Sequence, residues 1–478
     1  METVLFRLEQ AVWGFPLLTL ILGTGIFLTL RLRFLTLRQL PRAMGLLLRR
    51  GKGDGVSPLG ALCTSLSATV GTGNIVGVAT ALALGGPGAL LWMELSAAAG
   101  MAVKYAEGFF AVKYRVRSAD GSLHGGPFTY ISRGLGPGYR FLAAAFAFLG
   151  AAAGLCGVGT FVQVGSVSAC LTEYLGTLGR RGAVICLFGR QFSAAAAVIG
   201  AVFAVFSGLL IFGGMARISR VSTVLMPVMG GLYMACCLGI ILSRASLLPG
   251  TLLKILHDAF CPGAAVGGLL GAASAGVSRG IFSNEAGLGT APIAAAAAEN
   301  VTPEEQGLIS MTASVFDTFL ICTLTGLSLL LTGSGGLGVT GAMDAFALGL
   351  PLPAWMSRGL VVLCLTLFAF TTVVGWSYYG VECLRYLTGD RPAVRSLYLI
   401  LYLFTVLLAP LFPIQSVWQA ANIFNGLMAV PNLMGILLLA PQLPGAGLRR
   451  AGTPNKSGRR AQKRRCRIPA PVLQWKTS

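Results

Sequence analysis

Eleven apolar runs, each near the length that crosses a lipid bilayer, occupy most of this chain of 478 residues. A membrane-spanning helix needs about 20 mainly apolar residues, because the hydrocarbon core is roughly 30 Å thick. The runs are 11–30, 58–82, 86–112, 140–172, 192–213, 221–243, 263–298, 307–332, 356–384, 396–412 and 415–441. Backbone polar groups inside a membrane must be hydrogen-bonded internally, so the pattern predicts an all-α polytopic membrane protein with about 11 transmembrane helices.

Composition excludes a water-soluble fold. Hydrophobic residues make up 55% of the chain and charged residues only 11%, with a mean hydropathy of +0.77. Soluble domains carry about 25% charged residues. The run at 11–30 is long enough to span and ends at Arg31 and Arg33, so we expect a retained first helix rather than a cleaved signal peptide.

The basic residues predict the orientation. The net charge is +20, and Lys and Arg lie mainly in the gaps between apolar runs and in the tail at 442–478. A cytoplasmic tail puts 27 of them inside and about seven outside, as the positive-inside rule favours. We therefore expect a multi-pass protein of the cell inner membrane with its N-terminus outside and its C-terminus cytoplasmic. The basic tail is expected to be disordered and to meet anionic lipids rather than nucleic acid.

Two of the runs contain polar clusters near their middle. The first is Ser67-Ala68-Thr69-Val70-Gly71-Thr72-Gly73-Asn74-Ile75-Val76-Gly77 and the second is Arg279-Gly280-Ile281-Phe282-Ser283-Asn284-Glu285-Ala286-Gly287-Leu288-Gly289-Thr290-Ala291-Pro292. One interpretation of the first cluster is a close packing face that uses Gly73 and Gly77. The other is a helix that unwinds here, which frees carbonyls for a cation and N–H groups for a carboxylate. Such backbone is tolerated only where it lines a cavity within the protein.

The spacing of the two clusters favours the second interpretation. The helix at 263–298 comes five helices after the helix at 58–82. Two broken helices five apart are expected for an inverted five-helix repeat with the binding site between them.

Several single polar residues lie in other runs. Gln163, Thr371, Thr372 and Trp376 are pocket candidates if the two helices are broken. Asp317 is either structural or a proton site, and we favour the structural role.

Three charged residues share the run at 86–112. Glu94, Lys104 and Glu107 are expected to neutralise one another within that helix. The roles of Arg279 and Glu285 are not fixed by the pattern.

Enzyme chemistry has little support in the sequence. It contains no Walker loop, metalloprotease motif or nucleophile elbow, and neither its two histidines nor its eleven cysteines have metal-ligand spacing. We expect no enzyme activity and no cofactor other than a coupling ion. A polytopic membrane enzyme and a passive channel remain the alternatives to a transporter.

These motifs resemble the alanine or glycine:cation symporter family of the amino acid-polyamine-organocation superfamily. The likeness covers roughly residues 10–441. It rests on Val70 to Gly77, Gly85 to Gly88, Arg279 to Ala291, Gly375 to Gly380 and Asn422 to Ala429.

The resemblance implies a fold and a function. It implies a LeuT-type inverted five-helix repeat with broken first and sixth core helices. The parts would be a peripheral transmembrane helix at 11–30, a first repeat at 58–243, a second repeat at 263–441 and the tail at 442–478. The implied function is symport of small neutral amino acids (alanine, glycine, glutamine or serine) with Na+, or with H+ in some members.

The resemblance also implies site residues. The N–H groups of Thr72, Gly73 and Asn74 would hold the substrate carboxylate. Sodium would be held by the carbonyls of Ser67 and Val70 and the hydroxyls of Thr371 and Thr372. The pocket would be shaped by Gln163, Phe282, Ser283 and Trp376. The chain departs from the family at two places: Ala295 stands where the family has a histidine, and Thr160-Phe161 where Asn-Met is common. The second departure lies near the pocket and bears on substrate preference.

Overall fold

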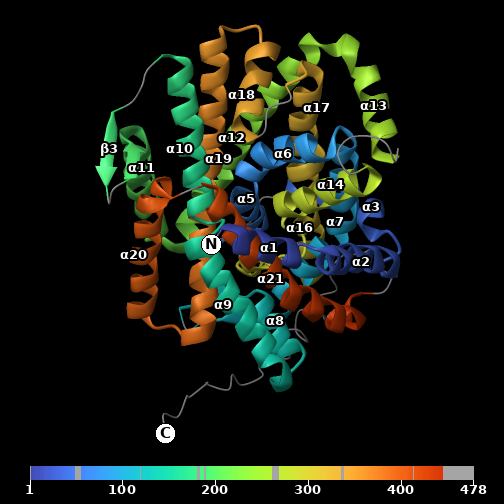
Figure 1. The fold of residues 1–478 in the computed structure, drawn as a ribbon. Helices are drawn as coiled ribbons and strands as arrows, with labels where there is room; N and C mark the ends of the chain where they lie inside the picture. Colours follow the sequence, from blue (N-terminus) through green and yellow to red (C-terminus); the bar gives the residue numbers. More distant parts are fainter. Residues whose placement is uncertain are drawn as a thin grey trace. The chain divides into compact units, whose positions relative to one another are not determined.

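The computed structural model describes residues 2–48, 55–118, 120–179, 183–187, 190–260, 268–334, 338–412 and 414–444. The expected tail at 442–478, with its anionic lipids, therefore lies almost wholly outside the described residues. Helices dominate the rest (Figure 1). The two small antiparallel hairpins are β1 (Val116–Arg117) with β2 (Leu123–His124), and β3 (Val184–Leu187) with β4 (Arg190–Ser193).

Each of the eleven predicted spans corresponds to helical structure. Eight helices of the described ranges are long and apolar enough to cross a membrane, and a bent pair adds a ninth. That pair is α5 (Pro58–Thr69) and the segment Thr72–Gly85, which contains α6 (Val76–Gly85), with 63° between them. The other two predicted spans are α7 (Gly88–Tyr114), which carries several charges, and α14 (Gly268–Asn284) with α15 (Ala291–Ala296), which is interrupted.

The remaining elements follow the predicted order. The other spans are α2 (Phe15–Arg31), α9 (Arg140–Cys156) with α10 (Phe161–Thr177), α11 (Ala194–Ile211), α12 (Gly214–Ser243), α16 (Pro303–Ser314) with η4 (Val315–Cys322) and α17 (Thr323–Thr332), α19 (Ala354–Thr388), α20 (Pro392–Leu408) and α21 (Ile414–Leu439). The shorter helices are α1 (Glu2–Val12), α3 (Leu35–Arg38), α4 (Leu40–Leu47), α8 (Pro127–Gly134), α13 (Leu248–Phe260) and α18 (Gly338–Gly349). Single 3-10 turns are η1 (Thr72–Asn74), η2 (Pro137–Tyr139), η3 (Ala245–Leu247), η5 (Ala409–Leu411) and η6 (Ala440–Gln442).

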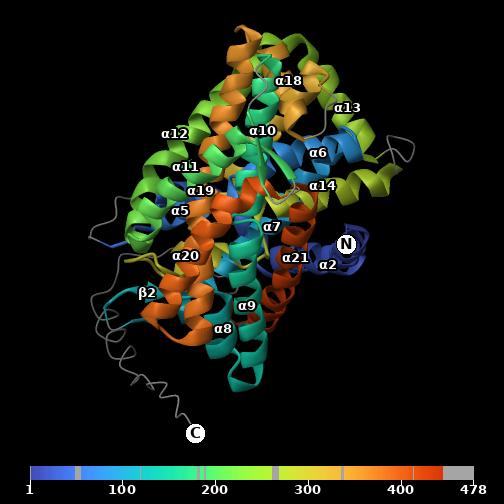
Figure 2. The same cartoon turned by 60° about the vertical axis from the view of Figure 1, so that its left-hand side comes forward.

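The broken helices lie among long straight ones. α10 and α19 run side by side, α5 packs against α19, and α6 packs against α14 and α18 (Figure 1). α1 and α2 pack against α21 and α7, at one side of the helices that hold the breaks (Figure 2). α9 and α10 form a single span that is interrupted between Cys156 and Phe161, which the sequence did not predict.

Small residues allow α7 and α14 to approach closely. A Cβ added to Gly276 of α14 would lie 2.3 Å from the carbonyl oxygen of Ala89 on α7. A Cβ added to Gly231 of α12 would meet no atom within 4 Å. Dispersion between close-packed backbones replaces the hydrophobic effect as the force that holds such helices together in a membrane.

Gly276→Ala should therefore destabilise the protein. The added methyl group overpacks the contact, which costs about 1–3 kcal/mol. Gly231→Ala adds the same methyl group in open space and gains helix propensity of up to about 1 kcal/mol, so it should be neutral or stabilising. The midpoints of thermal unfolding of the two purified variants in detergent compare them directly. Equal midpoints would contradict the close contact between α7 and α14.

Candidate functional site

The first break is a segment of unwound backbone between α5 and α6. Val70 is extended, with φ −71° and ψ 97°, and η1 follows it. Side chains satisfy the N–H groups that the helix no longer pairs. The Asn74 side-chain oxygen accepts from the Gly71 N–H at 3.1 Å, and Gln163 Oε1 accepts from the Thr72 N–H at 3.3 Å. All four residues are buried.

Oxygen atoms from α19 and the first break meet at one point. Thr372 Oγ1 lies 3.2 Å from the Ser67 carbonyl oxygen and 3.4 Å from that of Val70. The same hydroxyl lies 3.0 Å from the Phe368 carbonyl oxygen, one turn earlier on α19. Carbonyl and hydroxyl oxygens at an unwound turn are the ligands that transporters use for Na+.

Thr371 lies beside this cluster but turns away from it. Its hydroxyl is 3.0 Å from the Phe368 carbonyl oxygen and 3.5 Å from the sulfur of Met229 on α12. The structure therefore brings Ser67, Val70 and Thr372 together and places Thr371 at the edge. The Phe368 carbonyl oxygen accepts from both hydroxyls, and the sequence did not predict its participation.

The second break separates α14 from α15. Glu285, Gly287 and Gly289 there have φ of 52°, 88° and 84°, a left-handed conformation that glycine adopts without a Cβ penalty. Asn432 of α21 donates to the Gly287 carbonyl at 2.8 Å and to Glu107 Oε1 of α7, also at 2.8 Å. Two distant helices thus hold the unwound segment in place.

Asp317 joins the two breaks. It lies on the π-helical segment η4, where one of its carboxylate oxygens accepts from Asn74 Nδ2 at 2.8 Å. The other accepts from Ser283 Oγ at 3.2 Å and from Thr318 Oγ1 at 2.9 Å. The sequence predicted one of two roles for Asp317, a structural role or a proton site. The structure instead places its carboxylate in the candidate site, where it is only 1% exposed.

The charged residues of α7 pair differently from the expectation. Among the described residues, Glu94 binds Thr323 Oγ1 at 2.7 Å and Glu107 binds Asn432. Lys104 Nζ is fully buried and has no hydrogen-bond partner within the described ranges. The three residues form no direct ion pairs with one another there: Glu94 faces α17 and Glu107 faces α21, although the charge of Lys104 acts on Glu107.

The remaining predicted pocket residues lie at the first break and at the neighbouring interruption between α9 and α10. The Phe282 ring packs against Trp418, with 5.3 Å between ring centroids, and faces Gly73. Trp376 is fully buried beside the interruption between α9 and α10, where a Cβ on Gly159 would lie 2.7 Å from Trp376 Cβ. Its indole N–H has no partner among the described residues. Gln163 follows on α10, one turn after Gly159.

The glycines of the first break discriminate between its two interpretations. A Cβ on Gly77 would meet no atom within 4 Å, and one on Gly73 would make only ordinary contact with Phe282, at 3.5 Å. Neither glycine lies at a close helix–helix contact, so the geometry favours the unwound site over the packing face. The crowded glycine is Gly71, whose Cβ would lie 2.8 Å from Thr372 Oγ1 and 3.1 Å from Gln163 Oε1.

Comparisons with known proteins agree with this geometry. The model of the sodium:alanine symporter family matches residues 1–446. An uncharacterized transporter of Haemophilus influenzae is 45% identical, covering 91% of this chain and 93% of the relative. The sodium/alanine symporter AgcS of Methanococcus maripaludis is 41% identical, covering 90% and 92%. The probable sodium/glutamine symporter GlnT of Bacillus subtilis is 35% identical, covering 92% and 88%.

A solved structure shows the same fold. MhsT in complex with L-phenylalanine matches with a TM-score of 0.57 at 16% identity, covering 81% of this chain and 90% of that chain. MhsT is a LeuT-fold transporter, so the predicted fold class, a polytopic LeuT-like membrane protein, is confirmed.

Substitution of the crowded glycine should impair cation binding. In Gly71→Ala the new methyl group would displace Thr372 and Gln163, so we expect the apparent Na+ affinity to fall roughly tenfold or more, the equivalent of about 1.4 kcal/mol. Gly77→Ala is the matched control and should bind Na+ normally, because its methyl group enters open space. Sodium-dependent binding of radiolabelled alanine, corrected for folded protein, measures both. Equal losses of alanine binding in the two variants, in proportion to their losses of thermal stability, would instead support the packing interpretation.

Gly73→Ala tests the substrate side separately. The structure has room for this methyl group, so the variant should fold and insert normally. If the Gly73 backbone lies against the substrate carboxylate, alanine binding should weaken in Gly73→Ala and not in Gly77→Ala. The same binding measurement decides, and unchanged alanine affinity in Gly73→Ala would place the carboxylate elsewhere.

Proposed function

This chain belongs to the sodium:alanine symporter family, and from that membership we propose that it takes up small neutral amino acids with Na+ by alternating access. The proposed substrates are alanine and glycine, with glutamine or serine as further candidates. The names of two relatives, a sodium/alanine symporter and a probable sodium/glutamine symporter, support this choice. The observation that carries the proposal is the convergence of Thr372 on the Ser67 and Val70 carbonyls at the first break.

The substrate is proposed to lie between the two breaks. Its carboxylate would be held by the N–H groups of Thr72, Gly73 and Asn74. The N-terminus of the half-helix that follows an unwound turn carries a partial positive charge and therefore favours anions. Gln163, Phe282, Ser283 and Trp376 would surround its ammonium group and side chain. Gln163 accepts from the Thr72 N–H and the Gly71 carbonyl accepts from the Asn74 N–H, so substrate binding would have to replace these bonds.

Asp317 is proposed to bind a cation as well. Its carboxylate, together with the Ser283 and Thr318 hydroxyls that donate to it, gathers hard oxygen ligands in a buried place. A buried carboxylate is costly unless it is paired, and Na+ or a proton would neutralise it. The coupling ion is therefore proposed to be Na+, with H+ as the alternative at Asp317.

The placement in the cell is part of the proposal. We propose an inner-membrane protein with its N-terminus outside and its C-terminus in the cytoplasm, supported by the distribution of Lys and Arg. The hairpin β1–β2 and the loop between α19 and α20 then face the cytoplasm. The division into a peripheral helix at 11–30 and repeats at 58–243 and 263–441 belongs to the same proposal. Counterflow of labelled alanine in proteoliposomes distinguishes such a carrier from a channel or an enzyme.

Removal of the Thr372 hydroxyl should weaken Na+ activation of transport. Thr372→Val keeps the shape of the side chain and deletes the oxygen that faces Ser67 and Val70, so the Na+ concentration for half-maximal uptake should rise roughly tenfold or more, the equivalent of about 1.4 kcal/mol. Thr371→Val is the matched control and should have a smaller effect, because its hydroxyl faces Met229. The double variant should lose Na+ activation almost completely. Unchanged activation in the double variant would place the ion elsewhere.

Transport should be electrogenic if one Na+ accompanies one zwitterion. Each net charge that crosses the membrane gains about 2.3 kcal/mol per 100 mV, so an inside-negative potential should drive accumulation. Uptake of labelled alanine into proteoliposomes with a fixed Na+ gradient, with and without a potential imposed by valinomycin, measures this. Uptake that does not respond to the potential would contradict this stoichiometry.

A further inference from the structure

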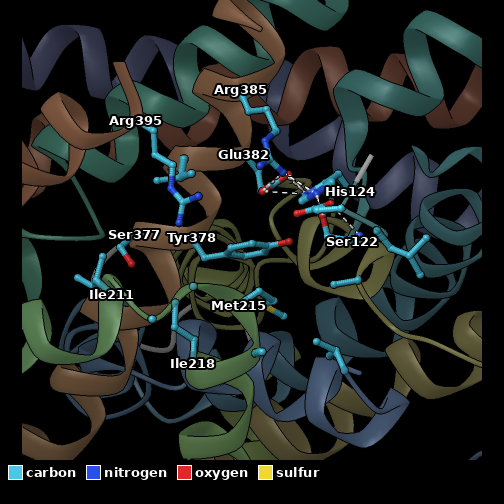
Figure 3. Close-up of a pocket in the computed structure, with 18 of the residues that line it drawn as sticks. Ser122, His124, Ile211, Met215, Ile218, Ser377, Tyr378, Glu382, Arg385 and Arg395 are labelled. Carbon is cyan, nitrogen blue, oxygen red and sulfur yellow. Dashed lines mark hydrogen bonds and ion pairs between the residues drawn. The ribbon is translucent and has the colours of Figure 1, made fainter. Parts of the chain in front are cut away.

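A separate cavity lies beyond the central site, toward the face that carries the β1–β2 hairpin. It encloses about 320 Å³ between that hairpin, the junction of α11 and α12, and the helices α19 and α20 (Figure 3). Ser377 and Tyr378 line it, and they follow Thr372 on α19 by five and six residues. At about 1.5 Å per residue the cavity begins roughly 8 Å along α19 from the proposed cation site.

One group of charges on the cavity wall is internally paired. His124 Nδ1 lies 3.0 Å from Glu382 Oε2, and Arg385 Nη1 lies 3.4 Å from Glu382 Oε1. Arg385 also binds Asp390 through two parallel hydrogen bonds of 3.0 and 3.1 Å. Arg385 is thus engaged on both sides, and its charge is balanced by these carboxylates.

Two charges on the wall are not paired in this way. The Arg395 side chain extends from α20 into the cavity (Figure 3), and its guanidinium has no hydrogen bond or ion pair with any described residue. The Glu299 carboxylate also lines the cavity without a side-chain hydrogen bond to the described part of the chain, although the charge of Arg115 acts on it.

A glycine lies beside each of these two charged groups, and its lack of a side chain makes room for the group. A Cβ on Gly55 would lie 2.2 Å from the Glu299 carboxyl carbon. Gly214, with φ +69°, has no side chain to fill the floor below Arg395, and a Cβ there would lie 4.0 Å from Arg395 Nη2. The cavity therefore presents to its interior a cation and a carboxylate that form no ion pair within the described part of the chain, both of them half-buried.

We propose that this cavity is a second binding site for the α-amino acid zwitterion, in which Arg395 binds the carboxylate and Glu299 binds the ammonium group. The inference rests on the proposed function, because the ligand is the transported substrate on its way between the central site and the cytoplasm. A volume equal to roughly ten water molecules admits a small amino acid with some hydration. Guanidinium and carboxylate are the groups that form charge-assisted hydrogen bonds with the two ends of such a ligand.

The balance of charge favours a zwitterion over a simple anion. Asp120, Glu299 and Glu382 line the same cavity as Arg385 and Arg395. Hydrogen bonds from Ser122 lower the pKa of Asp120, so this carboxylate is charged at neutral pH. Since the wall carries at least as many negative as positive groups, it offers an anion no net attraction beyond Arg395 itself.

The test compares the two faces of the membrane. In vesicles of uniform orientation, Arg395→Gln should raise the KM for alanine offered at the face of the β1–β2 hairpin by roughly 5- to 10-fold. The KM at the opposite face should stay within about twofold, because the central site is untouched. Glu299→Gln should have the same one-sided effect, and Arg395→Lys should restore most of the wild-type KM. Equilibrium binding of labelled alanine at saturation should fall from two per protein to one in Arg395→Gln.

Arg391→Gln is the matched control. It removes the same charge one turn away, where Arg391 is exposed at the start of α20 and does not line this cavity. Identical KM values for the Arg395 and Arg391 variants, or equal KM changes at both faces, would overturn the second site. An effect of Arg395→Gln without one of Glu299→Gln would also overturn it, since that pattern indicates an anion site. Absence of Na+-dependent alanine flux in the wild-type protein would instead overturn the proposed function, and this inference with it.

Discussion

Backbone polar groups inside a membrane must find hydrogen-bond partners, and the candidate site depends on how this chain meets that requirement at two breaks. At the first break the partners are the side chains of Asn74 and Gln163, which take the N–H groups of Gly71 and Thr72. Unpaired backbone groups there would each cost several kcal/mol, about as much as the margin of stability of many folds. The polar side chains within these spans are therefore needed for the fold as well as for any ligand.

The partners at the second break come from distant parts of the sequence. Asn432 and Glu107 are separated by 325 positions, yet Asn432 Nδ2 donates both to Glu107 Oε1 and to the Gly287 carbonyl. Because α7 and α21 both hold this segment, a shift of either helix would displace the backbone of the second break. Close backbone contact between α7 and α14, with no room for a Cβ at Gly276, makes such a shift costly.

The sequence predicts the elements of this site better than its contacts. The place of Thr372 beside Ser67 and Val70 was implied by the family resemblance. Glycine and polar residues in the middle of two apolar runs are a local signal, so both breaks could be expected from the sequence itself. The role of Asp317 could not, because its partners Asn74 and Ser283 lie 243 and 34 positions away and only the packing of η4 brings them together. The direction of the Thr371 hydroxyl depends similarly on where Met229 falls across the helix interface.

Asn74 connects the two proposed cation positions and thereby suggests how they are coupled. Its side-chain oxygen holds the Gly71 N–H, directly after the Val70 carbonyl that faces Thr372. Its side-chain nitrogen donates to Asp317, which in turn accepts from Ser283 at the second break. A cation that draws in the Val70 carbonyl would move the peptide that Asn74 holds, and a cation at Asp317 would compete with the Asn74 amide N–H for the carboxylate. Linkage between two binding sites is reciprocal. If bound Na+ raises the affinity for substrate, bound substrate therefore raises the affinity for Na+ by the same factor.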